Sequence, residues 1–370
     1  MYFANAPAFR GAVASLQSGS TRKRISRKNL ARIALPVPPV DQQKHIVAEI
    51  EKQFSRLDEA VANLKRVKAN LKRYKAAVLK AAVEGRLVET EAELARREGR
   101  SYETGEQLLQ RILETRRQKW EQTELAKMKE KGRIRTTKED KWKQKYKEPA
   151  APDTTDLPEL PEGWVWTLMG QVFDVYVGAT PSRAKPEYWG GEVPWVSSGE
   201  VAFCRIKATR ETISAKGLEN SSTVLHPAGT LLLGMIGEGK TRGQAAILDI
   251  EACNNQNSAA IRVSETDVLP EYVFSLLETE YEDTRRRGSG GNQPVLNKER
   301  VRQIPVPLPP LAEQQRIVAE VDRALSFVRE IAAKVEINCR RAERLRRSIL
   351  ARVFAGWLPT RAQAADHAAA

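Results

Sequence analysis

Cysteine and histidine are scarce in this 370-residue sequence, which has three of each. They are widely scattered, at Cys204, Cys253 and Cys339 and at His45, His226 and His367. An odd number of distant thiols forms neither a disulfide framework nor a metal-ligand cluster, so a reducing compartment such as the cytoplasm is expected. Each histidine is expected to be a surface or capping side chain, and no metal site is predicted.

Long apolar runs and catalytic patterns are also missing. No run approaches the roughly 20 residues that a membrane-spanning helix needs, and the N-terminal residues lack the basic-then-apolar layout of a secretory signal. The Pro-Pro pairs at 38–39 and 309–310 lack the polar and aromatic neighbours of a methyltransferase motif, and the acidic residues do not cluster as in a nuclease. The chain is therefore expected not to be an enzyme and to need no cofactor of its own.

One motif points to a nucleotide site. Residues 234–241, GMIGEGKT, match the phosphate-loop pattern G-x-x-x-x-G-K-[ST]. In such a loop a helix begins at the Lys-Thr pair, and its N–H groups bind phosphate. Here Gly243 and a β-branched run follow, which favours a strand–turn–strand hairpin with Lys240 and Arg242 at its tip. A P-loop ATPase stays as the less favoured alternative.

Positive charge is what the sequence has in excess. Its 61 Lys and Arg outnumber 47 Asp and Glu, for a net charge of +14, which attracts polyanions and most commonly nucleic acid. Residues 116–147 contain thirteen basic and five acidic residues, with Trp120, Trp142 and Tyr146 among them. These rings suit stacking on bases or anchoring a partner, and a solvated basic connector is an equally good interpretation. Residues 148–163 are rich in proline and read as a linker.

A phrase occurs twice in the chain. Residues 36–51, PVPPVDQQKHIVAEIE, return 271 positions later as PLPPLAEQQRIVAEVD at 307–322. Nine of the seventeen positions in 33–49 are identical to their counterparts in 304–320. This is an internal duplication. It extends without a gap to Gly85 and Gly356, which stand at the same offset.

Beyond the identical core, each copy keeps an apolar residue at every seventh position. The two lines are Ile50, Leu57, Leu64, Leu71 and Val78, and Val321, Val328, Val335, Ala342 and Ile349. A seven-residue apolar period indicates a coiled-coil seam. We expect two helices of roughly 40–45 residues, each about 65 Å long, that pair in antiparallel fashion. Two separate amphipathic helices on different domains are the alternative.

Between the copies, residues 164–304 read as a globular domain. Short β-type runs such as VPWVSS, GTLLLGMIG and SAAIRV are separated by Gly, Pro, Asn and Ser turns, and the helix-like PEYVFSLLETEYEDTRRR closes the region. This mixture predicts the α+β class with one small twisted sheet.

Together these features resemble the specificity subunit of type I restriction–modification enzymes. The resemblance rests on the twin openings LPVPPVDQQKHIVAEIE and VPLPPLAEQQRIVAEVD, and on ATPSRAKPEYWGGEVPWVSSGEV, MIGEGKTRGQAAI, NNQNSAAI and GSGGNQPVLN between them. It implies a target-recognition domain that reads DNA and an antiparallel coiled coil. It also implies modification subunits that use S-adenosylmethionine, and a restriction subunit that uses ATP and Mg²⁺.

The sequence departs from that family in one respect. The usual subunit has a recognition domain before each long helix, whereas here residues 1–19 align at the 271 offset with 272–290, the closing helix of the domain. The expected organisation is a remnant of a first recognition domain (1–24), a first long-helix repeat (25–88) and a basic helical insert with linker (89–156). A target-recognition domain (157–303) and a second long-helix repeat with a tail (304–370) follow. An active complex would be dimeric in this chain or would borrow a second recognition domain.

Candidate DNA-reading residues lie in the predicted turns of the recognition domain. Arg and Lys suit guanine edges, Asn and Gln suit adenine, and Ser and Thr suit either. On this basis we predict DNA contacts from Thr180, Ser182, Arg183, Lys185, Ser197, Ser198, Lys240, Thr241, Arg242, Asn255, Gln256, Asn257, Asn292 and Gln293. Trp189 and Trp195 are expected in the core. The interpretation is a non-catalytic DNA-recognition subunit; the alternative of another class is a coiled-coil scaffold without DNA specificity.

Overall fold

The computed structural model describes the chain except for residues 36, 131–139, 238, 287–295 and 355–370. The chain divides into two compact units, Met1–Tyr74 with Ser326–Ala370 and Lys75–Leu325. Two long helices, α3 (Val40–Val83) and α11 (Leu311–Val353), contribute residues to both units. At 44 and 43 residues, they confirm the two long helices predicted from the seven-residue period.

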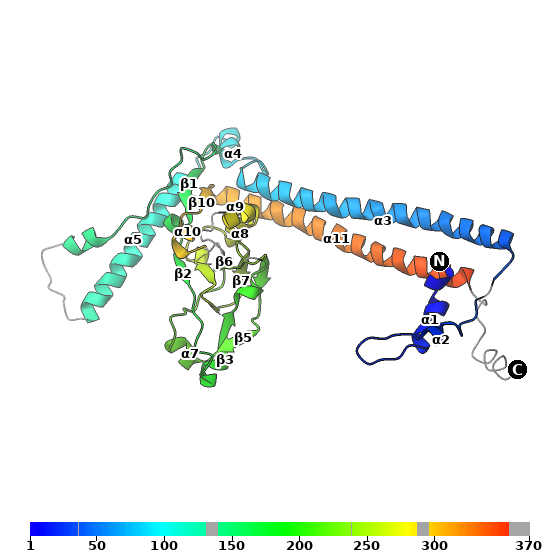
Figure 1. The fold of residues 1–370 in the computed structure, drawn as a ribbon. Helices are drawn as coiled ribbons and strands as arrows, with labels where there is room; N and C mark the ends of the chain where they lie inside the picture. Colours follow the sequence, from blue (N-terminus) through cyan, green and yellow to red (C-terminus); the bar gives the residue numbers. More distant parts are fainter. Residues whose placement is uncertain (36, 131–139, 238, 287–295, 355–370) are drawn as a thin grey trace. The chain divides into compact units, whose positions relative to one another are not determined.

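In the first unit, α3 and α11 pair in antiparallel fashion (Figure 1). Asp58 forms an ion pair with Arg346, and Lys68 lies 3.6 Å from Glu336, so partners descend along α11 as positions rise along α3. The unit also contains η1 (Phe3–Asn5), α1 (Pro7–Ser15) and α2 (Arg27–Leu30). Its small core consists of Ala6, Ile50, Phe54, Leu350 and Phe354.

The residues of the predicted seam are the covered positions of the two helices. Ile50, Val78, Val321 and Val335 are buried, and Leu57, Leu64, Leu71, Val328 and Ile349 are half-buried. Apolar residues off these lines, such as Val67 at 39% and Phe327 at 57%, are exposed. Each helix therefore buries one narrow stripe of its own surface, as a seven-residue period requires.

The second unit mixes helices with short strands, which confirms the α+β class. Its helices are α4 (Glu91–Glu98), α5 (Gly105–Glu130), α6 (Met169–Val172), α7 (Ala215–Glu219), α8 (Pro270–Thr279), α9 (Tyr281–Arg286) and α10 (Lys298–Arg302), with 3-10 turns at η2 (Asp140–Lys145), η3 (Pro186–Tyr188), η4 (Ser198–Glu200) and η5 (Val263–Glu265). Its strands are β1 (Val165–Leu168), β2 (Val175–Val177), β3 (Trp189–Val196), β4 (Cys204–Ile206), β5 (Glu211–Ile213), β6 (Leu231–Gly234), β7 (Ala245–Leu248), β8 (Cys253–Asn254), β9 (Ser258–Ile261) and β10 (Pro305–Leu308).

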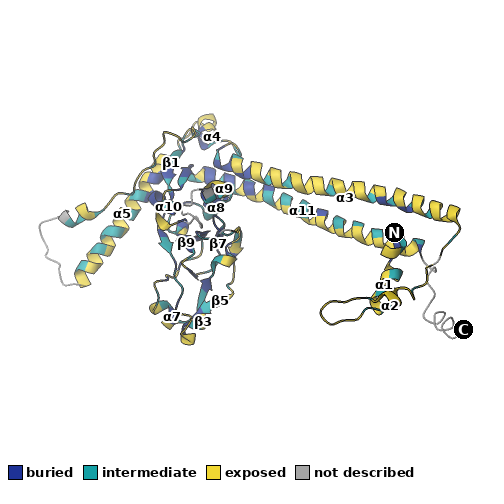
Figure 2. Cartoon of the chain, in the orientation of Figure 1, coloured by how far each residue is buried: buried dark blue, intermediate teal, exposed yellow. Residues whose placement is uncertain are grey.

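The strands of the described chain form three sheets where the sequence predicted one. The orders are β2-β9-β6-β7-β4, β5-β3-β8 and β1-β10. The runs Leu231–Gly234, Ala245–Leu248 and Ser258–Ile261 are buried throughout (Figure 2). Leu231 and Ile247 face one apolar core, and Leu232 and Ala246 face another. Because both faces are covered, these strands are continuously apolar rather than alternating.

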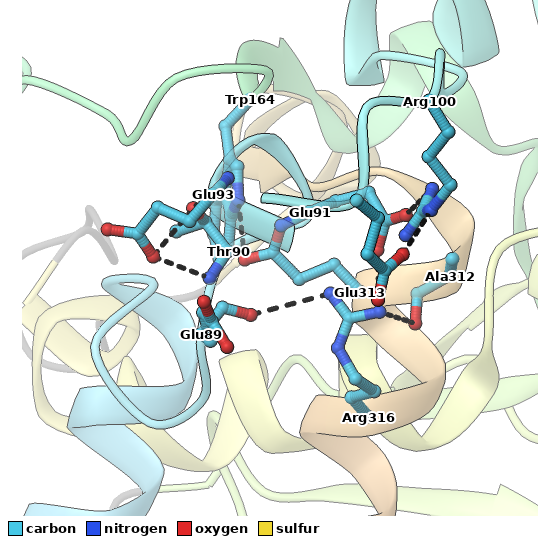
Figure 3. Close-up of polar contacts among 10 residues, drawn as sticks. Glu89, Thr90, Glu91, Glu93, Arg100, Trp164, Ala312, Glu313 and Arg316 are labelled. Atoms are coloured by element: carbon cyan, nitrogen blue, oxygen red, sulfur yellow. Dashed lines mark hydrogen bonds and ion pairs between the residues drawn. The ribbon is translucent and has the colours of Figure 1, made fainter. Parts of the chain in front are cut away.

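A buried polar junction joins α4 to α11 (Figure 3). Glu91, which is 2% exposed, forms ion pairs with Arg100 at 2.6 Å and with Arg316 at 2.5 Å. Burial raises the pKa of Glu91, but the hydrogen bonds from Arg316 and Arg100 outweigh it and leave that pKa lowered. Glu313 accepts the N–H of Glu91 and the indole N–H of Trp164, both at 2.9 Å, and its burial raises its pKa.

His226 corrects the expectation that each histidine is a surface or capping group. Its side chain is 0% exposed, and its Nδ1 accepts a hydrogen bond of 3.2 Å from Arg262 Nε. Burial, together with the charge of Arg262, lowers its pKa to about 4. His226 is therefore a neutral core side chain.

None of the helices in the described residues is long and apolar enough to cross a membrane.

Candidate nucleic-acid interface

Four turns of the recognition region lie at one end of the five-stranded sheet. The strand registers pair Val177 with Ala259, Ala259 with Leu233, and Leu233 with Ala245. Since β2 and β6 end at this row while β7 and β9 begin there, residues 178–185, 235–244 and 255–257 leave the sheet at the same end. The stretch 197–203, which leads into β4, joins them because Cys204 pairs with Ala246.

Hydrogen bonds connect three of these turns. Thr180 donates to Gln256 Oε1 at 2.5 Å, and Asn255 Nδ2 donates to Ser198 Oγ at 3.5 Å. Gly178 permits the close approach, because a Cβ there would lie 2.0 Å from the carbonyl oxygen of Asn254. The structure thus brings Thr180, Ser198, Asn255 and Gln256 together.

Asn255 and Gln256 differ in what they present to solvent. Asn255 is 7% exposed, and its Oδ1 accepts the N–H of Asn257 and the hydroxyl of Ser258, so its side chain organises the turn. Gln256 is exposed, and Asn257 is half-buried. Among these amides, Gln256 is the one available to a base edge.

Arg183 is engaged within the protein. Its guanidinium lies 3.6 Å from the centre of the Trp189 ring and forms a two-nitrogen ion pair with Glu211, which lowers the pKa of Glu211. Trp195 is 2% exposed, as expected of a core side chain, and Trp189 is half-buried against it. Arg183 therefore needs to exchange Glu211 for DNA before it can contact a base.

The remaining side chains of the first two turns make local contacts. Lys185 Nζ donates to the Tyr188 hydroxyl at 3.0 Å. Ser197 Oγ donates to Glu200 at 3.0 Å as part of a capping turn, and the carbonyl of Ser182 accepts the Trp189 indole N–H at 3.3 Å. Ser182 and Lys185 are exposed and can approach a ligand without rearrangement of the fold.

The GMIGEGKT segment connects two antiparallel strands, β6 and β7. The N–H of Gly243 donates to the carbonyl of Gly234 at 2.8 Å, and Gly243 adopts a φ of 82° that favours glycine. Of its described residues, none from Lys240 onward begins a helix before β7. The segment is a hairpin. The phosphate-loop alternative is wrong, because it requires a helix that begins at the Lys-Thr pair.

Only part of this hairpin is presented to solvent. Lys240 is exposed, and its ammonium has no ion-pair partner in the described part of the chain. Thr241 is half-buried, and Arg242 is only 8% exposed, so the expectation that Arg242 stands at the tip is wrong. Its carbonyl instead accepts a hydrogen bond of 3.1 Å from Arg285.

Helix α9 supports the hairpin with residues that sequence reasoning did not assign to it. The Tyr281 hydroxyl donates to the carbonyl of Lys240 at 2.7 Å, and Arg285 lies over the Tyr281 ring at 5.4 Å. The four-residue spacing of Tyr281 and Arg285 was the available signal, since it places both on one helix face. Asn292 and Gln293 lie outside the described residues.

The basic segment has its own aromatic cluster. Trp120 of α5 stacks on Trp142 at 5.9 Å and contacts Tyr146 at 5.3 Å. The three rings pack on one another and fasten η2 to α5. Within the described ranges, no group of three or more His, Cys, Asp or Glu side chains could hold a metal ion.

Comparison with known proteins matches this region to a family. Residues 161–336 match the type I restriction modification DNA specificity domain. The chain is 26% identical over 172 residues to the EcoR124I/EcoR124II specificity subunit of Escherichia coli, and 28% identical over 182 residues to the MjaIX specificity subunit of Methanocaldococcus jannaschii. Residues 161–336 thus match the DNA specificity domain, and the chain is similar to type I restriction enzyme specificity subunits.

The matches to these specificity subunits are partial. They cover 45% and 48% of this chain and 42% and 40% of the relatives. Two solved structures share the fold at 17% identity. One, from work on assembly and conformational transition of the type I R-M system, has a TM-score of 0.63 and covers 96% of this chain and 70% of its own. The other, the HsdS subunit of Thermoanaerobacter tengcongensis, has a TM-score of 0.52, with 96% and 69% covered.

Proposed function

We propose that this chain is the non-catalytic DNA sequence-recognition subunit of a type I restriction–modification complex. The turn end of the five-stranded sheet enters the major groove, where base pairs present distinguishable patterns of donors and acceptors. Lys240 contacts phosphate or guanine, Gln256 suits adenine, and the hydroxyls of Thr180 and Ser198 suit either.

One observation carries the proposal: turns from separate parts of the sequence converge at a single end of the sheet. Thr180–Gln256 and Asn255–Ser198 hydrogen bonds connect residues 178–185, 197–203 and 255–257 there, and the hairpin between β6 and β7 leaves the sheet at the same end. A base-reading surface needs amides, hydroxyls and cations together on a rigid support. The buried strands β6, β7 and β9 supply that support.

The partners and cofactors belong to the same proposal. The paired helices α3 and α11 set a spacing and dock modification subunits, which bind S-adenosylmethionine and methylate adenine. A restriction subunit supplies ATP- and Mg²⁺-dependent translocation and cleavage. This chain contributes recognition alone.

Mapping methylated adenines in cells that contain this chain and its modification subunits tests the proposal. We expect methylation at one recurring sequence, and a changed sequence with Gln256→Ala. Lys207→Ala is the matched control, because exposed Lys207 follows the other end of β4. Methylation at the same sequence in the Gln256 variant and the wild type would remove Gln256 from the reading surface.

The arrangement of the methylated sequence reports on the number of recognition domains. An interrupted inverted repeat indicates two copies of this chain. We expect an asymmetric two-part sequence only in cells that also contain a second specificity chain. Such a sequence in cells without a second specificity chain would contradict the need for a second recognition domain.

A further inference from the structure

An acidic residue that sequence reasoning did not assign to DNA lies beside the turns of the recognition region. Glu211 begins β5, opposite Trp195 near the end of β3. The N–H of Arg210 donates to Oε1 of Glu200, in the turn 197–203, at 3.0 Å. The start of β5 is therefore bonded to this turn, and Glu211 stands at the edge of the surface proposed to read bases.

The Trp189 ring holds the ion-pair partner of Glu211 in place. The guanidinium of Arg183 lies 3.6 Å from the centre of that ring, and two of its nitrogens donate to the two carboxylate oxygens of Glu211. The Trp189 indole donates to the carbonyl of Ser182 at 3.3 Å, which ties the ring to the neighbouring backbone. A planar guanidinium held in this way loses little conformational freedom on binding a ligand. Arg183 and Glu211 thus form a preorganised pair of donors and acceptors.

Both charged groups of the pair are accessible. The side chains of Arg183 and Glu211 are 54% and 38% exposed. Solvent weakens the attraction between exposed charges, so the pair can separate when each group gains a new partner. A ligand that separates them must offer acceptors to Arg183 and a donor to Glu211 side by side.

The major-groove edge of a G·C base pair offers this arrangement. Guanine presents the acceptors N7 and O6, and cytosine presents the N4 amino donor. O6 and N4 are neighbours, because they bond to each other in the base pair. We propose that Arg183 and Glu211 together read one G·C pair, with Arg183 on guanine and Glu211 on cytosine. Because this role rests on the proposed DNA recognition, its test must separate failure of the one from failure of the other.

The other three base pairs fit Arg183 and Glu211 less well. When adenine faces Arg183, thymine places its O4 acceptor against the Glu211 carboxylate. A reversed C·G pair places the N4 amino donor against the guanidinium, and a T·A pair offers Arg183 one acceptor where guanine offers two. The carboxylate also repels phosphate. Since a charged group left without a partner costs more than a missing neutral hydrogen bond, G·C is the favoured ligand.

Selection of bound duplexes from a randomised pool, followed by sequencing, tests the pair. We expect the wild-type chain to enrich a motif with a strongly preferred G·C pair. Arg183→Gln and Glu211→Gln are each expected to lower that preference, at the same position, about tenfold, the factor produced by 1.4 kcal/mol. The other positions of the motif should not change. Glu251→Gln is the matched control, because exposed Glu251 follows the other end of β7.

Base analogues in a duplex that carries the motif test the contacts with the unaltered chain. 7-Deazaguanine lacks the N7 acceptor, and N4-methylcytosine has a methyl group in place of one amino proton. Measured by fluorescence anisotropy, 7-deazaguanine at the G·C position is expected to weaken binding of the wild type more than binding of Arg183→Gln. N4-methylcytosine is expected to weaken binding of the wild type more than binding of Glu211→Gln.

The contrary results are distinct. Variants that alter different positions of the motif, or none, overturn the proposal, as does wild-type binding that neither analogue weakens. If Arg183→Gln weakens binding to all sequences equally and lowers the salt slope by about one unit, Arg183 contacts phosphate and the proposal fails. A wild-type motif without a G·C pair removes this role and leaves DNA recognition intact, whereas a pool with no enriched motif removes both.

Discussion

Lys240 is the exposed cation of the β6–β7 hairpin. Its role in DNA binding can be tested separately from any effect on the stability of the fold. Lys240→Ala is expected to weaken DNA binding and to reduce the dependence of log K on log salt by about one unit, as loss of one phosphate contact does. Fluorescence anisotropy with a DNA duplex measures both quantities. Lys207→Ala is the control, as an exposed lysine at the opposite end of the sheet.

The same variant addresses the ATPase alternative. The purified wild-type chain is expected to show no steady ATP hydrolysis, because its glycine-rich segment is a hairpin. Hydrolysis by the wild type that Lys240→Ala abolishes would contradict this assignment.

His226 is expected to make the stability of the fold depend on pH. Its pKa is lowered from 6.5 to about 4 in the folded chain by burial and by Arg262. Between these pH values the unfolded chain binds a proton that the folded chain does not, so the free energy of unfolding falls as pH drops. The loss reaches about 3 kcal/mol near pH 4, at 1.36 kcal/mol per pKa unit.

Urea unfolding of the wild type and of His226→Gln from pH 7 to pH 4 measures this loss. Glutamine keeps an acceptor for Arg262 but does not titrate. We expect the variant to lose less stability than the wild type across this range. Parallel curves for the two proteins would show that His226 does not control the decline.

Residue types at the interface could be predicted from the sequence, whereas their contacts could not. Turn residues with amide, hydroxyl and basic side chains were identifiable between apolar runs. The ion pair between Arg183 and Glu211 could not be predicted from the sequence, because it depends on the strand register that places Glu211 opposite Trp195. The burial of Arg242 likewise depends on α9, whose Arg285 bonds to its carbonyl, and that of His226 on contacts with Ala252, Tyr176 and Arg262, which local pattern does not encode.

At the scale of elements, Leu64 tests the helix pair. Leu64 is half-buried on the line of seven-residue spacing, so Leu64→Asp is expected to lower the free energy of unfolding by about 2 kcal/mol. Modification subunits should then fail to co-purify with the chain. Val67→Asp on the exposed side of α3 is the matched control and should change neither property.

Urea unfolding and a pull-down of tagged chain with modification subunits give the two readouts. A Leu64→Asp chain that retains both stability and co-purification would leave the antiparallel seam without support.

The long helices were the most predictable elements because one period fixes both their length and their covered side. The sheets were less predictable. β6, β7 and β9 are identifiable as apolar runs, but the separation into sheets depends on the parallel pairs β3–β8 and β4–β7, which join distant segments. Sequence patterns mark strands and leave such pairings open.

At the scale of the whole molecule, any single recognition domain, such as the one predicted at residues 157–303, can discriminate DNA sequences only to a limited extent. Each good bidentate base contact contributes about 1–3 kcal/mol of discrimination, and phosphate contacts dominate affinity and make it depend on salt. The predicted domain at residues 157–303 is therefore expected to recognise a few base pairs, with modest preference over random DNA and strong salt dependence.

Selection from a pool of randomised DNA duplexes shows whether this chain recognises a DNA sequence. The purified chain is mixed with the pool at low and at moderate salt, and the bound duplexes are sequenced. We expect one enriched motif of a few base pairs, the same at both salt concentrations, that changes with Gln256→Ala and not with Lys207→Ala. A bound pool with no enriched motif at either concentration would contradict DNA sequence recognition and leave a coiled-coil scaffold as the function.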